Sequence, residues 1–397
     1  MRKFNLWVLA IMIGSSVISC KKKGCMDERA TNYSAEAKKD DGTCVYPEPS
    51  TTPDKLAIPS TYTFLRKGSS SVSFNGQTQR MNMASELIAY MKTANTPGTS
   101  ISAQKMKDMF ANANSPFSSS ELNGTTKQLK DKAVSDNSKH AFDFDFYMDG
   151  LAKLSDSTKT GVFAGKKDTA GVIQSGSKQY LFDSKGMEYA QIIEKGIMSA
   201  VFLYQITFGY LGDEKMAVDN TTLEDGANYT KMEHHWDEAF GYFSEAVDFP
   251  TSGTDRFWGK YSNGRNAVLG CNKTIMDAFL AGRTAIVNKD LVERDKQREI
   301  IKENLALIAA GTAIHYLKEA KANLSDDALR NHTLSEANAF VRGLQYASGY
   351  ALSSAQTSQI LSYMGGGNHY LVSATDLDNA IALISDKYKL DDKKGSL

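Results

Sequence analysis

The segment from Gly186 to Leu211, GMEYAQIIEKGIMSAVFLYQITFGYL, constrains the fold of this chain more than any other. From Gly196 onward it carries no charged residue on any face. A helix that is apolar all round must be buried all round, so this segment predicts a helix in the middle of a bundle. The rest of the chain must then supply the helices that cover it.

Further helices are expected from the spacing of apolar residues, at 80–93, 125–136, 140–156, 230–247, 266–288, 291–321, 333–353 and 374–388. Two short alternating runs, ended by Asn75-Gly76, predict a small N-terminal β-hairpin. The predicted class is therefore all-α with this hairpin, in a helical domain at 61–397. We expect that domain to comprise two related bundles, divided near 250–265.

The first residues have the pattern of an export signal. Arg2 and Lys3 precede an apolar run from Leu6 to Ile18, which is short for a membrane span. The run ends in VISC, which resembles the lipobox of bacterial lipoproteins. The resemblance implies a signal peptide at 1–19, cleavage before Cys20 and acylation of that cysteine, and several acyl chains anchor a protein firmly. An ordinary signal peptide with a chance cysteine is the alternative.

Three other cysteines remain, Cys25, Cys44 and Cys271. Export leads to an oxidising compartment, where Cys25 and Cys44 are free to pair. Residues 20–45 are too few to bury a core, so we expect a disulfide to hold this module together. It also resembles a short cysteine-bounded module of secreted Bacteroidetes proteins. Cys271 lies in an apolar helical stretch and is expected to be buried.

Four oxygen-bearing residues of the module, Asp27, Asn32, Asp40 and Asp41, are candidate calcium ligands, because calcium prefers oxygen. The alternative is that they form the turns of a closed loop. A Pro- and Thr-rich tether is expected to follow at 46–60. Lys plus Arg and Asp plus Glu both number 46, so the zero net charge predicts no nucleic-acid partner.

Adjacent histidines draw attention to the stretch MEHHWDEAFGYF, Met232 to Phe243. On a helix, Trp236 and Phe240 lie on an apolar face, and Glu238 lies opposite, within one turn of His234 and His235. Taken alone, this pattern is typical of a polar helix side beside a core.

A second stretch, HTLSEANAFV, repeats the pattern with His332 and Glu336. The repetition predicts an internal duplication, with each histidine bonded to the acid one turn away. Such buried pairs lock a helix in register, or they supply ligands for iron or haem inside a bundle. Both interpretations stay open for His235, Glu238, His332 and Glu336. No signature of a catalytic residue accompanies them, so no catalytic residue is predicted.

Four segments carry a family resemblance: YTFLRKGSSSVSFNGQTQRMNM, NSPFSSSELNGTTKQLKDK, HHWDEAFGYF and HTLSEANAFVRGLQY. They resemble a lipoprotein family of the Bacteroidetes known as domain of unknown function 4856. That family is similar to the imelysins, periplasmic proteins of two helical bundles that are linked to iron uptake. The resemblance implies a Gly-x-His-x-x-Glu motif at Gly186, where Glu188 replaces the histidine and Gln191 the glutamate. These two residues are therefore further candidates for a metal or ligand site.

The sequence thus favours a non-enzymatic outer-membrane lipoprotein that assists iron or haem acquisition beside a transporter. Lys21 to Lys23 favour its periplasmic face. The first alternative is a glycan-binding accessory lipoprotein, in which exposed Trp258 and Tyr261 would stack on a sugar ring. The second is a metal-dependent peptidase, for which no zinc signature is present.

Overall fold

The computed structural model describes residues 21–46, 55–134, 141–158, 160–252 and 255–397. The chain divides into two compact units, Met1–Lys55 and Leu56–Leu397. The predicted signal peptide at 1–19, Cys20 and residues 47–54 of the predicted tether lie outside the described residues. Within the described residues, no helix combines the length and the apolar character that crossing a membrane requires.

Over its described residues, the first unit has almost no regular secondary structure. The predicted disulfide between Cys25 and Cys44 is present. Isolated bridges join Cys25 to Tyr33 and Lys23 to Lys39. Buried hydrophobic groups are few, with Cys25, Ala30 and Ala37 the apolar ones. The unit therefore depends on its covalent cross-link and not on a packed core.

Replacing both Cys25 and Cys44 by serine is expected to unfold this unit alone. Closing a loop of this length contributes about 3 kcal/mol in the chain-entropy model, which a unit with so small a core cannot replace. Limited proteolysis read by mass spectrometry should then cut within 25–44, while the thermal transition of the second unit stays unchanged. Continued protection of 25–44 in the double variant would contradict this expectation.

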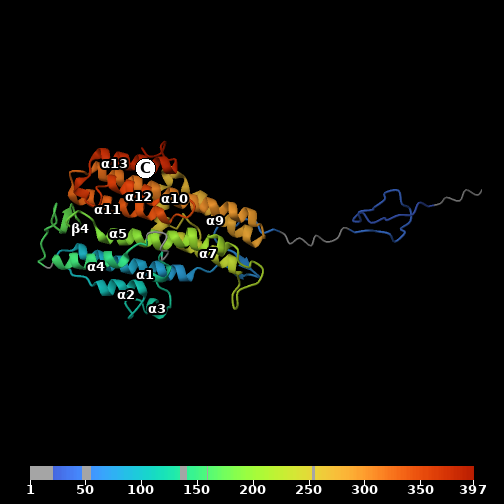
Figure 1. Cartoon of the computed structure of the whole chain (residues 1–397). Coiled ribbons are helices and arrows are strands. Elements are labelled where there is room, and N and C mark those ends of the chain that lie inside the picture. The colour runs from blue at the N-terminus through green and yellow to red at the C-terminus, as the bar shows by residue number, and fades with distance from the viewer. Residues whose placement is uncertain (1–20, 47–54, 135–140, 159, 253–254) are drawn as a thin grey trace, which may run out of the picture. The chain divides into compact units, whose positions relative to one another are not determined.

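The second unit is mostly helical (Figure 1). Its α-helices are α1 (Asn75–Lys92), α2 (Ala103–Ala111), α3 (Ser120–Gly124), α4 (Phe144–Ser157), α5 (Tyr189–Gly196), α6 (Asp213–Met216), α7 (Lys231–Phe243), α8 (Phe257–Leu269), α9 (Cys271–Val287), α10 (Leu291–Ala322), α11 (Asp327–Gly343), α12 (Ser354–Tyr363) and α13 (Ala374–Tyr388). Short 3-10 turns are η1 (Thr93–Asn95), η2 (Lys130–Lys132), η5 (Leu344–Tyr346) and η6 (His369–Leu371). Two antiparallel hairpins complete it, β1 (Leu65–Arg66) with β2 (Ser69–Ser70), and β3 (Gly171–Ser175) with β4 (Lys178–Phe182). The predicted class, all-α with a small N-terminal hairpin, is confirmed.

A central helix runs through the unit, as predicted. α5 continues without a break into two π-helical stretches, η3 (Ile197–Leu203) and η4 (Gln205–Tyr210), and every residue of η3 is buried. The hydroxyl groups of Ser199 and Thr207 donate to the carbonyl oxygens of Lys195 and Leu203, four residues earlier. Such bonds compete with the backbone for those carbonyls, which accounts for the wider π turns.

The other helices cover this central helix on both sides. In Figure 1, α5 lies between the layer of α11 to α13 and the layer of α1, α2 and α4. α11 packs on α5, while α7 packs on η4 further along the same helix. One hydrophobic core extends from Tyr62 to Leu397, with no division near 250–265. The relation of two bundles by duplication stays a prediction.

Several local predictions were wrong. Residues 125–134, the described part of the helix expected at 125–136, form no α-helix beyond the short turn η2, because Asn112 donates to the carbonyl oxygens of Leu122, Thr125 and Lys127 and fixes another conformation. The interval 248–265 between two expected helices, and therefore an expected loop, contains most of α8, which starts at a buried aromatic pair, Phe257–Trp258. The hairpin β3–β4 and the short helices α2 and α12 were not predicted. Cys271 is free and buried, as expected.

Candidate functional site

The predicted histidine–acid contact on α7 is confirmed. His235 Nδ1 lies 3.2 Å from Glu238 Oε2, and His234 Nε2 lies 4.0 Å from Glu238 Oε1. Gln77 on α1 also donates to Glu238, at 3.0 Å. Burial works to raise the pKa of Glu238, but the hydrogen bonds and the two neighbouring imidazoles outweigh it and hold the pKa below its usual value. This group ties α7 to α1.

The predicted contact between His332 and Glu336 on α11 is wrong. His332 Nδ1 bonds instead to Glu188 Oε2, at 2.6 Å, across the interface between α11 and α5. Glu336 pairs with Lys195 Nζ, at 3.1 Å, across the same interface. Glu188 is fully buried at the start of α5, and its backbone N–H donates to Ser335 of α11. Partners on a packed helix thus replace the intrahelical partner that the spacing suggested.

His332 is held in its pair by the surrounding charges and by an aromatic ring. Its imidazole stacks on Tyr180 of β4, with the ring centroids 4.3 Å apart. Burial works to lower the pKa of His332, but the carboxylate of Glu188 outweighs it and raises the pKa above the ordinary 6.5. The pair and the stacked ring thus join three elements, α5, α11 and β4.

The raised pKa of His332 makes stability depend on pH with a defined sign. A histidine with a higher pKa in the folded state contributes stability below its unfolded pKa, near 6.5, and loses it as the pH rises through the folded value. The free energy of unfolding of the wild type should therefore fall, relative to His332→Gln, as the pH rises above 6.5. Urea melts of both proteins from pH 5.5 to 9 measure the difference. A constant difference would contradict the assignment.

Lys195 lies at the centre of a second buried ion group, which the sequence analysis missed. Its side chain is 3% exposed and contacts Glu194 at 2.6 Å as well as Glu336. Lys92 of α1 also pairs with Glu194, at 2.6 Å. Burial works to lower the pKa of Lys195, but the two carboxylates outweigh it and keep the ammonium charged. A lysine directly before a charge-free helix was the signal in the sequence.

The candidate binding residues Glu188 and Gln191 lie on the buried face of α5. They are 0% and 4% exposed, and one side-chain oxygen of each has no hydrogen-bond partner among the described residues. Gly186, just before them, has a φ of 85°. A Cβ atom there would lie 2.5 Å from the side chain of Asn331, so this position requires glycine. His369, which the sequence did not single out, donates from Nδ1 to the carbonyl oxygen of Gly186, at 2.9 Å.

Among the described residues, these groups do not form the donor set of an iron ion held by side chains alone. Over the described residues, no group of three or more His, Cys, Asp or Glu side chains lies close enough to hold a metal ion. The ammonium of Lys195 already neutralises Glu336, and a second cation there would be repelled. Each histidine meets one carboxylate only, so the ligand set of a metal-dependent peptidase is not formed by these residues either.

The proposed calcium ligands of the first unit are also occupied by other bonds. Asp27 accepts from Arg29 and from Tyr46. Asp40 and Asp41 each accept from the backbone N–H two residues later, and Asn32 bonds to the backbone of Thr43 and Val45. These are turn-forming bonds, which favour the alternative, and calcium binding by these residues stays a prediction.

The aromatic platform expected for a sugar is absent at Trp258 and Tyr261. Trp258 is 0% exposed, and its indole N–H donates to the carbonyl oxygen of Met198 in the central helix, at 2.8 Å. The Tyr261 hydroxyl lies 3.3 Å from that of Tyr316. Both residues face the core because the expected loop is helix α8, so neither is free to stack on a ligand.

A third buried ion group lies beside α7. Arg283 of α9 is fully buried and contacts Asp237 at 2.9 Å and Glu233 at 3.2 Å. Arg66 of β1 also pairs with Glu233, at 2.7 Å, and Tyr62 donates to Asp237, at 2.8 Å. Burial works to lower the pKa of Arg283, but the two carboxylates outweigh it. The group holds the N-terminal hairpin against α7 and α9.

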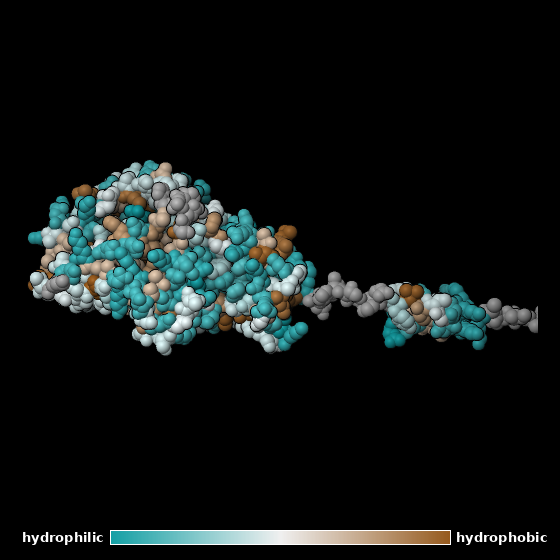
Figure 2. Space-filling model, turned by 60° about the horizontal axis from the view of Figure 1, so that its bottom comes forward, coloured by the Kyte–Doolittle hydropathy of each residue, from teal (hydrophilic) through white to brown (hydrophobic). Residues whose placement is uncertain are grey.

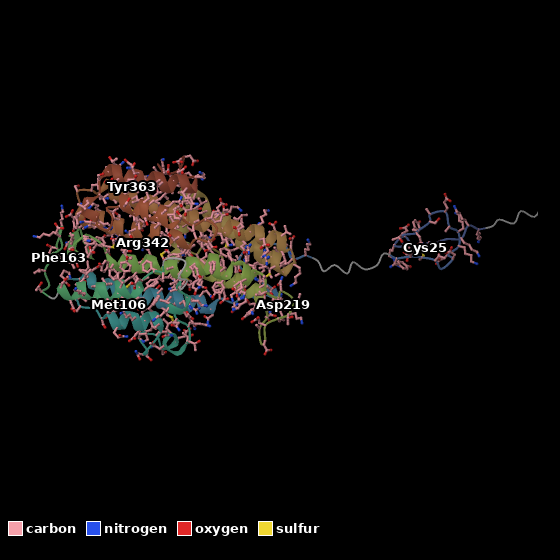
Figure 3. All side chains as sticks on the ribbon, viewed as in Figure 1. Cys25, Met106, Phe163, Asp219, Arg342 and Tyr363 are labelled. Atoms are coloured by element: carbon pink, nitrogen blue, oxygen red, sulfur yellow. A yellow bond between two sulfur atoms is a disulfide. The ribbon has the colours of Figure 1, made fainter. Side chains whose placement is uncertain are left out.

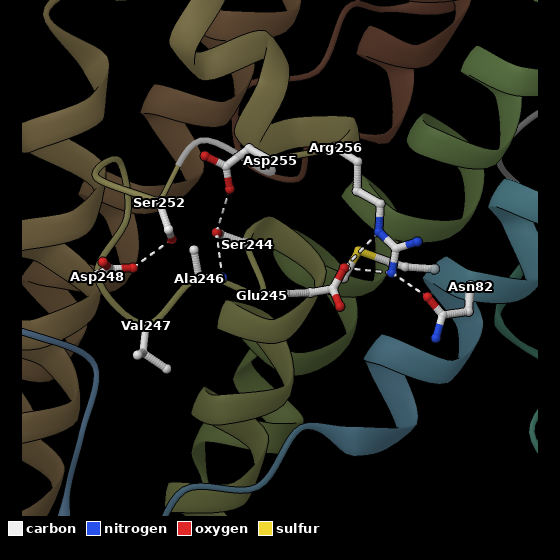
Figure 4. Close-up of a pocket in the computed structure, with 10 residues that line it drawn as sticks. Asn82, Ser244, Glu245, Ala246, Val247, Asp248, Ser252, Asp255 and Arg256 are labelled. Atoms are coloured by element: carbon white, nitrogen blue, oxygen red, sulfur yellow. Dashed lines mark hydrogen bonds and ion pairs between the residues drawn. The ribbon is translucent and has the colours of Figure 1, made fainter.

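A polar pocket of about 610 Å³ lies between α1 and the segment that joins α7 to α8 (Figure 4). Arg256 crosses it and donates to Glu245 at 2.6 Å and to Asn82 at 2.7 Å. Asp248 and Asp255 also line it. The pocket therefore contains three carboxylates and one guanidinium, and its charge is negative in excess. This excess favours a ligand that has hydroxyl groups or a positive charge.

The comparisons with known proteins place the second unit. No curated protein and no solved structure matches the chain. The imelysin resemblance therefore stays a prediction. One family model, described as a domain of unknown function (DUF4856), matches residues 59–390, which include α7, α11 and the polar pocket. The chain belongs to this family.

Proposed function

We propose that the chain is a non-enzymatic cell-envelope lipoprotein that assists iron or haem acquisition. In this proposal, acylated Cys20 holds it on the periplasmic face of the outer membrane, beside a transporter. The observation that carries the accessory role is that Glu238 of α7 and His332 of α11 are engaged in bonds to neighbouring helices, to Gln77 of α1 and to Glu188 at the start of α5. Side chains that are bonded in this way stabilise the packing of the helices. A rigid protein that docks beside a transporter requires such packing.

Export and anchoring have separate support. The disulfide between Cys25 and Cys44 is typical of an oxidising compartment. The VISC lipobox provides the acylation site, and the unit at 21–46 provides a spacer before the helical unit. The iron or haem assignment rests on the similarity of the family to the imelysins, of whose Gly-x-His-x-x-Glu motif this chain keeps Gly186, with Glu188 and Gln191 in place of the other two residues.

The test is a deletion strain grown with haem as the sole iron source. The proposal expects the transcript to rise under iron starvation and the deletion to slow growth on haem. Wild-type protein should restore growth, Cys20→Ser should not, and the matched variant Cys271→Ser should. Expression and growth that are indifferent to iron would overturn the iron role. Restoration by Cys20→Ser would overturn the need for the anchor.

A glycan-binding accessory lipoprotein is the second candidate, supported by the polar pocket at Arg256. Its carboxylates and amide suit the hydroxyl groups of a sugar, although no exposed aromatic ring belongs to its lining. A glycan array should then give a signal that Asp248→Ala abolishes. Asp378→Ala, an aspartate of a remote pocket, is the matched control and should keep the signal. A signal that Asp248→Ala leaves unchanged would exclude this pocket.

A further inference from the structure

Exposed aliphatic side chains gather at one end of the second unit. Of the large hydrophobic residues that are exposed in this unit, the following lie there: Leu56, Ile58, Leu65, Leu223, Leu291 and Val292, with Val292 83% exposed. Figure 2 shows hydrophobic residues at this end of the helical unit. We call these six residues the apolar end. Isolated exposed aliphatics are ordinary, but a group of this size marks an interaction surface.

Hydrogen bonds join the segments that carry the apolar end. Leu56 and Asn288, in the turn between α9 and α10, bond to each other twice, at 2.8 and 2.9 Å. Asn220, in the loop before α7, donates to Ile286 at the end of α9, at 2.8 Å. Asn228 of the same loop donates to the carbonyl oxygens of the β1–β2 hairpin. The six side chains therefore stand on one rigid platform and not on separate mobile loops.

The platform lies where the chain enters the second unit. Leu56 is the first residue of that unit and belongs to the apolar end itself. The Cα atoms of Cys25 and Cys44 are only 4.8 Å apart. The five residues before Cys25 and the twelve from Cys44 to Leu56 therefore span at most about 60 Å from Cys20, whatever their conformation.

We propose that the apolar end rests on the lipid surface of the membrane that anchors the chain. This inference deepens the proposed function and rests on its acylation of Cys20. A surface within about 60 Å of its anchor meets the membrane at a millimolar effective concentration, so even weak adsorption is populated. Aliphatic side chains suit the boundary between headgroups and acyl chains. Exposed charges of both signs, such as Lys67 and Asp219, surround the apolar end. Because both signs are present, we expect its membrane binding to depend on apolar contact more than on the charge of the lipids.

The opposite end of the unit provides a matched control. Asp219, in the loop before α7, and Phe163 lie at opposite ends of the second unit (Figure 3). Val162, the neighbour of Phe163, is 54% exposed. Val162→Cys and Val292→Cys therefore place the same label on exposed valines at the two ends. Both variants are made with Cys271→Ser, which removes the remaining free thiol.

The experiment uses the full acylated protein in phosphatidylcholine–phosphatidylethanolamine vesicles, with an NBD label on each cysteine. A lipid-borne nitroxide should quench the label at position 292 several times more strongly than the label at 162. Equal quenching at both positions, or none at 292, would overturn the proposal. So would a label at 292 that is shielded from water without quenching, because a protein segment or a second copy would then cover it.

A second variant separates this inference from the anchor. Ile58→Asp with Leu65→Asp should lower the quenching at 292 to the level at 162, while the protein still floats with the vesicles. Loss of flotation in the parent protein would instead indicate that acylation fails, which is the failure of the proposed function. Unchanged quenching in the double aspartate variant would overturn the apolar contact.

Discussion

Replacing Arg283 by methionine is expected to lower the free energy of unfolding by about 3–5 kcal/mol. Arg283 is fully buried between Asp237 and Glu233, at 2.9 and 3.2 Å. Glu233 keeps a second partner in Arg66, but Asp237 keeps only hydrogen bonds from Tyr62 and a backbone N–H. Burial already raises the pKa of Asp237 with the guanidinium present. Without the guanidinium, the Asp237 carboxylate stays in the core with no opposite charge. This unpaired buried group is what lowers the free energy of unfolding.

The measurement is a denaturant melt of the wild type, Arg283→Met and Lys273→Met. Lys273 pairs with Asp277 on the surface, with 85% and 55% of the side chains exposed. Its loss should cost about 0–1 kcal/mol, as for other exposed pairs. Adding Asp237→Leu to Arg283→Met should recover part of the loss, because the uncompensated acid is then removed. Equal losses in Arg283→Met and Lys273→Met would contradict the role of the buried group.

Lys195→Met is expected to have an effect of similar size, about 3–5 kcal/mol, by the same mechanism. Its ammonium stands between Glu194 and Glu336, and Glu336 has no second cation among the ion pairs of the described residues. Glu194 keeps its pair with Lys92. The loss should therefore come from Glu336, on α11, and loosen the contact between α5 and α11.

A double variant tests this origin. Lys195→Met with Glu336→Leu should be more stable than Lys195→Met alone, because a buried pair replaced by apolar groups of similar size is often tolerated. Lys321→Met, which breaks the exposed pair with Asp378, is the matched control and should cost about 0–1 kcal/mol. If the double variant is less stable than the single one, the loss does not arise from an unpaired Glu336.

The central helix was predictable because its signal is local. A charge-free run from Gly196 to Leu211 requires burial on all sides, and the structure buries it on all sides except near Phe208, which is 46% exposed. Its π turns were not predictable from that run. They depend on where Ser199 and Thr207 direct their hydroxyl groups, and the spacing of apolar residues carries no information about these bonds.

The histidine pairs show which contacts can be predicted from the spacing of residues along one helix. It correctly joined His235 to Glu238, because both lie on α7 and one turn brings them together. It failed for His332, whose partner Glu188 lies 144 positions earlier in the chain. The packing of α11 on α5 decides that partner, and nothing in either segment alone reports this packing.

The missed elements have a similar explanation. The sequence IQSGSKQYLF has alternation around Gly176, a hairpin signal that was present but was not used in the prediction. Trp258 was placed in a loop because Gly, Asn, Asp and Thr surround it. Its burial against Met198 is a tertiary contact, and that contact overrides the loop-forming composition.

The central claim is that the pair of His332 and Glu188 locks α11 to α5 and does not bind metal. Elemental analysis of the wild type and His332→Ala, both purified from the native host, tests it most directly, with a denaturant melt of each sample. The account predicts substoichiometric transition metal in both proteins and a loss of about 1–3 kcal/mol in the variant, as expected for leaving the buried Glu188 unpaired. About one metal ion per chain in the wild type, absent from a variant of unchanged stability, would contradict it.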